Sequence, residues 1–405
     1  MHWTLAAVAA IVILLPASRA AAAKIDITPS ISLDQVYDSN VFNTDGNEKG
    51  DFIFRATPAV TFSLKMPETT LNLRSSLTSD TYYKYNDRNT TTSAITLALD
   101  SQPPIRLSPR FSIAPSGHFV QARDSYFRTQ LVPTGDPLVP ASIASESAVR
   151  KTRDYGAALR INYLVTPNTA FSLGGGFSKL QFLDNTVLDN TSGNVGSRVF
   201  KGDTTLTYNF TPLLSSGIFV NTSYNTFENG RDSRTVAGGL TGSYRYSPSL
   251  TVTARAGASR AQESGFSSLP DRTSWSPYGL FTLAYLDNTF KASLTGSVDQ
   301  SGGGSLGFTT QRESVTLSLT DQFSSHWWGG LSGNYQVNRS LDPAKSEDLT
   351  SVAGTAGIRY QPWQWATFHL SGTAFRQMSN GTVGSDLQRY SAFLGVTVGN
   401  TYNIY

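Results

Sequence analysis

The sequence predicts an all-β fold, specifically a single transmembrane antiparallel β-barrel of about 18 strands with short periplasmic turns and longer extracellular loops. Three observations lead to this prediction. Apolar side chains alternate with polar ones from end to end, short connections alternate with long ones, and the chain is polar on average although it is rich in aromatic residues and glycine.

The alternation has a period of two residues. Apolar residues occupy every second position in segments such as 52–64, 155–163, 290–298 and 390–398, and no stretch shows a helical period. Successive side chains of a strand point to opposite faces, so one parity of each segment faces lipid and the other faces the lumen.

The connections alternate in length. Short ones with Pro, Asn and Ser lie at 66–69, 166–169, 211–213, 247–249, 287–289, 324–325 and 361–363, and polar stretches between them are longer, the longest being 123–152. Short turns at one end and long loops at the other are typical of bacterial outer-membrane barrels, in which the turns are periplasmic. Counting the segments predicts about 18 strands, with both termini in the periplasm.

Composition limits the remaining choices. The chain has no cysteine, which excludes disulfides and cysteine-ligated metals, and its net charge of +3 is not that of a nucleic-acid-binding protein. A soluble β-sandwich or propeller would also alternate. Aromatic residues near segment ends favour a membrane barrel, because they match the interfacial girdles of such proteins; these residues are Tyr246, Trp275, Tyr285, Trp327, Tyr360, Trp363 and Trp365.

Residues 1–23 differ from the rest. An apolar run from Ala6 to Pro16 precedes small residues up to Ala23, which predicts a cleaved secretory signal peptide rather than a membrane anchor, since the run is too short to span a bilayer. Residues 24–405 then form the barrel, and the predicted location is the bacterial outer membrane.

The lumen-facing parity carries charged residues, and these are the candidate site residues. They are Arg55, Arg74, Arg160, Arg255, Lys291, Arg312, Arg359, Asp203, Asp299 and Asp321. One interpretation is that they pair across strands and brace the wall; the other is a mildly basic lumen that favours anionic or neutral hydrophilic solutes. The loop 123–152 either folds inward as a constriction or lies at the surface.

Four aromatic residues are also expected on the lumen parity, where they would offer stacking surfaces to sugar rings: Tyr83, Phe219, Trp328 and Phe393. Catalytic and cofactor motifs are missing from the sequence. Only His118, His326 and His369 follow the predicted signal peptide, and there is no Walker A loop, HExxH motif or haem motif, so we expect no enzyme, no cofactor and no metal.

The segment from Ile31 to Thr44, which contains Tyr37-Asp-Ser-Asn-Val-Phe42, and the following segment from Asp51 to Pro58 resemble the opening of the family called beta-barrel porin 2. The resemblance covers about 30 residues, while the length and the roughly 18 strands agree over the rest. It implies an outer-membrane barrel associated with exopolysaccharide and exosortase gene clusters and acting as an exit channel for a polysaccharide. A simpler interpretation of the motif is a strand end capped by turn-forming residues.

The sequence thus predicts an outer-membrane channel for hydrophilic solutes, with export of an exopolysaccharide favoured by the resemblance. A passive diffusion porin for small solutes and a plugged surface or adhesin barrel remain as alternatives. The expected partners are the lipid bilayer, a polysaccharide or other hydrophilic solute and, for an exporter, a periplasmic partner; nucleic acid is not expected.

Overall fold

The computed structural model describes residues 24–67, 69–122, 151–183, 196–228, 230–264, 271–301, 309–341, 348–380 and 386–404. The predicted signal peptide and nearly all of the loop 123–152 lie outside these ranges, so both remain predictions. No helix in the described part of the chain is long and apolar enough to cross a membrane.

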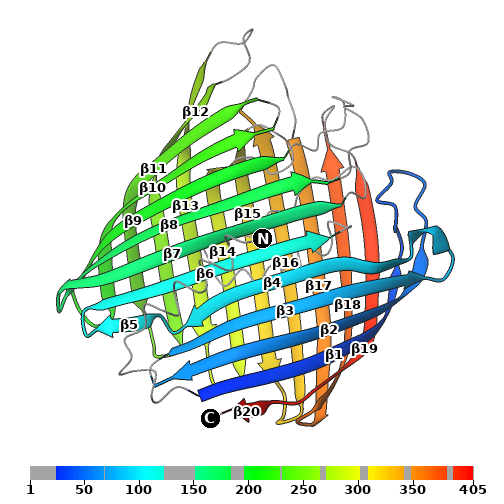
Figure 1. The fold of residues 1–405 in the computed structure, drawn as a ribbon. Coiled ribbons are helices and arrows are strands. Elements are labelled where there is room, and N and C mark those ends of the chain that lie inside the picture. The colour runs from blue at the N-terminus through cyan, green and yellow to red at the C-terminus, as the bar shows by residue number, and fades with distance from the viewer. Residues whose placement is uncertain are drawn as a thin grey trace.

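Twenty strands form one antiparallel sheet (Figure 1). They are β1 (Lys24–Asp38), β2 (Asp51–Met66), β3 (Thr69–Tyr82), β4 (Thr90–Gln102), β5 (Ile105–Ser108), β6 (Phe111–Ala122), β7 (Thr152–Thr166), β8 (Thr169–Phe182), β9 (Ser197–Asn209), β10 (Leu214–Phe227), β11 (Asp232–Arg245), β12 (Leu250–Ser264), β13 (Arg272–Leu286), β14 (Phe290–Ser301), β15 (Thr310–Gln322), β16 (Trp327–Ser340), β17 (Asp348–Trp363), β18 (Ala366–Ser379), β19 (Leu387–Gly399) and β20 (Tyr402–Ile404). A short 3-10 helix, η1 (Asn86–Arg88), follows β3.

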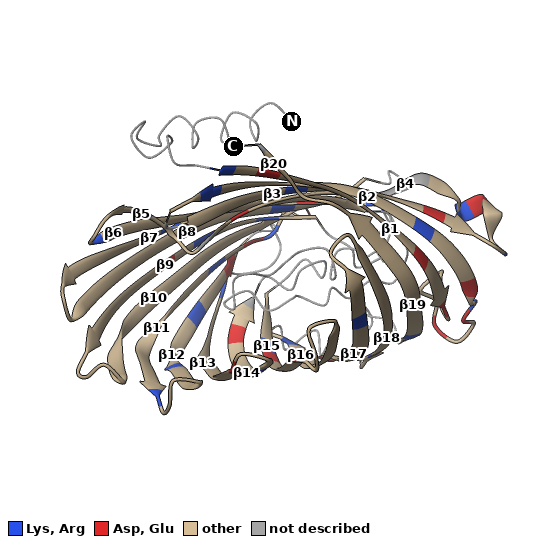
Figure 2. Ribbon diagram, turned by 90° about the horizontal axis from the view of Figure 1, so that it is seen from below, with Lys and Arg blue, Asp and Glu red and all other residues tan. Residues whose placement is uncertain are grey.

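The sheet closes because β1 pairs with both β2 and β19. Two strands add no new position to the wall. β4 and β5 pair with successive parts of β6, and β19 and β20 pair with successive parts of β1. Twenty strands minus these two leaves 18 wall positions, which confirms the predicted barrel. Seen along its length, the barrel is a flattened ring with β1–β9 on one side and β12–β18 on the other (Figure 2).

The first residues of β1 and the strand β20 lie together at the end of the barrel that carries the short turns (Figure 1). We call this the turn end and the opposite end the loop end. The pairing of β1 keeps one register from Gly399 to Ile404, so Tyr402 and Ile404 stay on the outward parity without a bulge. The turn predicted at 361–363 is displaced: β17 continues to Trp363 and the turn is at 364–365.

The outer face is apolar and exposed. Leu159, Ile218, Leu240, Leu331 and Leu394 are each more than 40% exposed, which would be unfavourable in water over so large a surface. All the predicted girdle residues are exposed except Tyr360, which is half-buried and stacks on Trp327 with ring centroids 4.4 Å apart. A closed barrel with an apolar outer band and aromatic girdles is the architecture of proteins that span the bacterial outer membrane. The protein is an outer-membrane β-barrel.

Candidate functional site: the lumen wall

Three of the predicted lumen arginines form ion pairs with acidic residues of other strands, two of them on the adjacent strand. Arg55 Nε lies 2.8 Å from Asp80 Oδ1, and Arg312 Nε lies 3.0 Å from Asp299 Oδ1. Arg160 lies 3.6 Å from Asp203, on the second strand along. Asp203 and Asp299 are therefore neutralised by arginines, and these pairs brace the wall in the way that the first interpretation predicts.

Two of the lumen ion pairs cross a whole strand, and each passes over a glycine. A Cβ atom at Gly174 of β8 would lie 2.0 Å from Asp203 Oδ1, so only glycine leaves room for the pair between Arg160 of β7 and Asp203 of β9. In the same way Gly395 of β19 leaves room for His369 of β18 to reach Asp34 of β1.

The other four predicted lumen cations have no ion pair among the described residues. Arg74 and Lys291 are exposed on the lumen parity, and Arg359 lies over the Trp328 ring at 4.6 Å. Arg255 lies 5.4 Å from the Phe219 ring. The two predicted lumen carboxylates that face inward are already paired, so they do not neutralise these four cations.

Arg255 belongs to a compact group at a sharp corner of the wall. The rings of Phe219 on β10 and Tyr278 on β13 lie 5.1 Å apart although two strands separate them, and Asn221 Nδ2 donates to Tyr278 Oη at 3.0 Å. Gly239 and Gly257 lie between them in the register, and a Cβ atom on either would lie 2.1 Å from a backbone carbonyl oxygen of the next strand. We call Gly239, Gly257 and the two rings the glycine corner, since the bend there depends on missing side chains.

A second compact group lies on the lumen face at the loop end of β1, β2, β3 and β19, and the sequence did not predict it. Val41, which follows β1, is 1% exposed and packs against the lumen-facing side chains of Val36, Ile53, Tyr82 and Phe393. The loop after β1 therefore folds over the inner face of these strands. We call the residues 36–51, Tyr82, Arg88, Arg389 and Phe393 the clasp.

Polar contacts hold the clasp together. Arg389 of β19 binds both carboxylate oxygens of Asp38 through Nε at 3.0 Å, and its Nη1 donates to Asn43 Oδ1 at 3.1 Å. Arg88 donates to the Val41 carbonyl and lies 4.6 Å from the Phe42 ring. Asn43 has a φ of 49°, a left-handed conformation that asparagine tolerates better than most residues.

The clasp contains the Tyr37-Asp-Ser-Asn-Val-Phe42 part of the motif that resembles the beta-barrel porin 2 family. Asp38, Asn40, Val41 and Asn43 are each at most 3% exposed and contact strands from both ends of the chain. The motif is thus more than a capped strand end, and its visible role is to join β1 to β19.

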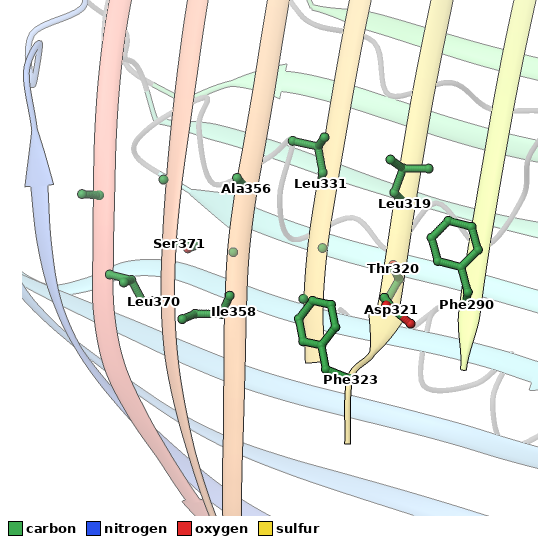
Figure 3. A pocket seen from close by; sticks show the side chains of 15 residues that line it. Phe290, Leu319, Thr320, Asp321, Phe323, Leu331, Ala356, Ile358, Leu370 and Ser371 are labelled. Atoms are coloured by element: carbon green, nitrogen blue, oxygen red, sulfur yellow. The ribbon is translucent and has the colours of Figure 1, made fainter. Parts of the chain in front are cut away.

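Asp321 was predicted to face the lumen, and this prediction is wrong. Its cross-strand partner is Phe290, and it shares its parity with Leu319, which is outward-facing. Figure 3 shows Asp321 with Phe290, Leu319 and Leu331 around a shallow hollow of about 630 Å³ on the outer face. Asp321 is the next-to-last residue of β15, at the turn end, where an outward charge costs only about 0–1 kcal/mol.

The predicted lumen parity of the aromatic residues is right for Phe219, Trp328 and Phe393 and wrong for Tyr83, and most of these rings are not accessible from the lumen. Tyr83 follows β3, and its hydroxyl donates to the outward Gln35 at 3.3 Å. Phe219 and Phe393 do face inward, but they are 2% and 7% exposed because they pack within the corner and the clasp. Trp328 alone of the four is partly accessible from the lumen.

Two of the three histidines, His118 and His369, take part in the same kind of wall contact, whereas His326 lies exposed at a turn beside Ser325. His118 Nε2 lies 3.4 Å from Asp154 and His369 Nε2 lies 2.5 Å from Asp34, each an isolated pair. No group of three or more His, Asp or Glu residues in the described ranges is arranged to hold a metal ion. The expectation that the chain is no enzyme and carries no cofactor stays a prediction.

No family model matches this chain, and no curated protein matches it, so the resemblance to the beta-barrel porin 2 family remains unconfirmed. Among solved structures, OccAB4 of Acinetobacter baumannii is 11% identical with a TM-score of 0.44, over 94% of this chain and 98% of that one. Pseudomonas aeruginosa OccK2 (OpdF) in complex with glucuronate is 10% identical with a TM-score of 0.46, over 94% and 98%. P. aeruginosa OpdK with vanillate is 12% identical with a TM-score of 0.45, over 94% and 99%. Similarity at this level carries no information about what this barrel transports.

Proposed function

We propose that the protein is a diffusion channel for hydrophilic solutes in the outer membrane and that its lumen favours anions. The observation that carries the proposal is the charge of the wall. Arg74, Arg255, Lys291 and Arg359 face the lumen without an ion pair among the described residues, whereas Asp203 and Asp299 are paired. A barrel of about 18 strands has a lumen wide enough for water, and basic side chains lining such a pore attract anions.

Export of an exopolysaccharide, which the resemblance implies, has less support. A channel that guides a sugar polymer would gain from accessible aromatic rings along the lumen. Three of the four expected rings are packed into the wall or face outward, and the family motif serves the clasp. The alternative of a small-solute porin therefore fits the described wall better than the export channel does.

The test is the reversal potential of the refolded protein in a planar bilayer under a potassium chloride gradient. We expect the wild type to pass chloride in preference to potassium and the variant R74Q/R255Q/K291Q/R359Q to lose that preference, because four lumen charges are removed. The matched control is K179Q/R198Q/R234Q/R260Q, which removes four basic charges from outward positions and should leave the reversal potential unchanged.

Two outcomes would count against the proposal. A wild-type barrel that carries no current would indicate a plugged surface barrel instead. A conducting barrel that is blocked by long neutral oligosaccharides, but not by short ones or by small organic anions, would restore the export interpretation.

A further inference from the structure

Five basic residues form a row on the outer face at the loop end of β7–β12. They are Arg153, Lys179, Arg198, Arg234 and Arg260, and each lies within five residues of the loop end of its strand. Their outward parity follows from the register, because Lys179 is the cross-strand partner of Tyr155 and of Arg198, and Arg260 is the partner of Val236 and Trp275.

The arrangement places like charges together. Lys179 and Arg198 are direct cross-strand partners, and Arg153 and Arg234 are diagonal neighbours of Lys179 and Arg260 respectively. Like charges in these positions destabilise a sheet unless an anion lies between them. None of the five forms an ion pair with a described residue; Arg153 donates to Gln121, and Arg260 lies 5.9 Å from the Trp275 ring.

Two acidic residues in the described ranges share this end of the outer face, and neither forms an ion pair with the row. The carboxylate of Asp232 accepts a hydrogen bond from the Tyr224 hydroxyl at 3.0 Å. Glu228 follows β10 and lies against Gly196. Among the described residues, five basic side chains therefore face two acidic ones at this end of the outer face, so the row has a net positive charge, and Arg198, Arg234 and Arg260 are exposed.

The surroundings of the row identify its depth in the membrane. On the turn-end side of the row, the aromatic rings of Tyr155, Phe177 and Phe200 follow one another across β7, β8 and β9, with centroid distances of 6.1 Å and 5.1 Å. Further towards the turn end, the outward positions of β7–β12 carry no charged side chain at all, and the structure describes all of these strands. Aromatic rings followed by basic side chains mark the level of lipid headgroups.

We propose that this row binds the phosphate groups of anionic lipids in the leaflet at the loop end of the barrel. The proposal rests on the barrel's placement in a bilayer and is independent of whether the lumen conducts. Guanidinium groups match phosphate geometry. Arg153, Lys179 and Arg198 lie on three consecutive strands and Arg234 and Arg260 on two more beyond β10. With neighbouring strands about 4.8 Å apart, the two groups together can hold more than one phosphate. A lipid with several phosphates on one headgroup fits such a row best.

The test measures lipid binding by native mass spectrometry of the full-length barrel released from detergent, with diphosphorylated lipid A as the probe. We expect the variant K179Q/R198Q to bind this lipid about 20- to 30-fold more weakly than the wild type, since each basic residue at a membrane surface is worth about 1 kcal/mol. Monophosphorylated lipid A should bind more weakly than the diphosphorylated form, and phosphatidylcholine should not distinguish the variants.

Two controls separate this effect from others. R376Q removes an exposed outward arginine from β18, away from the row, and the lumen variant R74Q/R255Q/K291Q/R359Q removes four charges from the inside. Both should bind lipid A as the wild type does. Equal binding by K179Q/R198Q, an equal loss in R376Q, or full displacement of the lipid by millimolar inorganic phosphate would overturn the proposal. A silent bilayer recording would leave the proposal intact, because the lipid measurement does not require an open pore.

Discussion

The clasp and the glycine corner shape two parts of the same wall by opposite means. In the clasp, buried side chains from both ends of the chain fill the inner face, with Asn40 at 0% and Asp38 at 3% exposure. In the corner, side chains are missing at Gly239 and Gly257, and two aromatic rings from separated strands meet over the gap. A barrel can therefore fix its shape either by adding contacts at the seam or by removing atoms at a bend.

The difference bears on function. The clasp uses its buried charges internally, because Arg389 is bound to Asp38, and the adjoining Arg55 is likewise bound to Asp80. The corner leaves Arg255 beside an aromatic pair with no carboxylate partner among the described residues. The segment that resembles a family motif thus helps to close the barrel between β1 and β19. The residues that we propose set solute preference lie elsewhere on the wall.

The largest expected effect is in the clasp. Arg389→Ala should lower the free energy of unfolding by about 3–5 kcal/mol, because it leaves the buried Asp38 carboxylate without a partner. The side chains of the pair are 8% and 4% exposed. Urea unfolding in phospholipid vesicles, followed by tryptophan fluorescence, measures the change.

The matched control is Arg160→Ala, whose pair with Asp203 is 3.6 Å long with side chains 34% and 26% exposed. Loss of a partly exposed pair should cost no more than about 1 kcal/mol. Similar losses of unfolding free energy in the two variants would mean that the ion pair of the clasp stabilises the barrel no more than the pair of Arg160 and Asp203 does.

An intermediate effect is expected at the glycine corner. Gly239→Ala places a Cβ atom 2.1 Å from the Ala256 carbonyl oxygen, so the backbone must shift, and we expect a loss of about 1–3 kcal/mol in the same assay. Gly296→Ala is the control, because no atom lies within 4 Å of its added Cβ. If both substitutions were neutral, the bend would not depend on the missing side chain.

The architecture could be predicted because alternation and turn spacing are local properties of the sequence. The strand count, the closed barrel and the outward Trp275 and Trp327 all follow from them. The clasp could not be predicted, since its contacts join Asp38 to Arg389 across 351 residues. The partners of Arg160 and His369 were equally hidden, because each lies across an intervening strand and a glycine.

The smallest expected effect concerns Asp321, which was predicted on the wrong parity of β15. Starting from Val315 and Leu317 as outward residues, Asp321 is also outward, and its pairing with Phe290 bears this out. We expect Asp321→Asn to change stability by no more than about 1 kcal/mol and to leave the reversal potential unchanged.

Asp299→Asn, its inward counterpart, should free Arg312 and shift the reversal potential towards greater preference for anions. Equal shifts in the two variants would show that Asp321 contributes to the lumen after all, and they would weaken the link between strand parity and solute preference on which the lumen assignment depends.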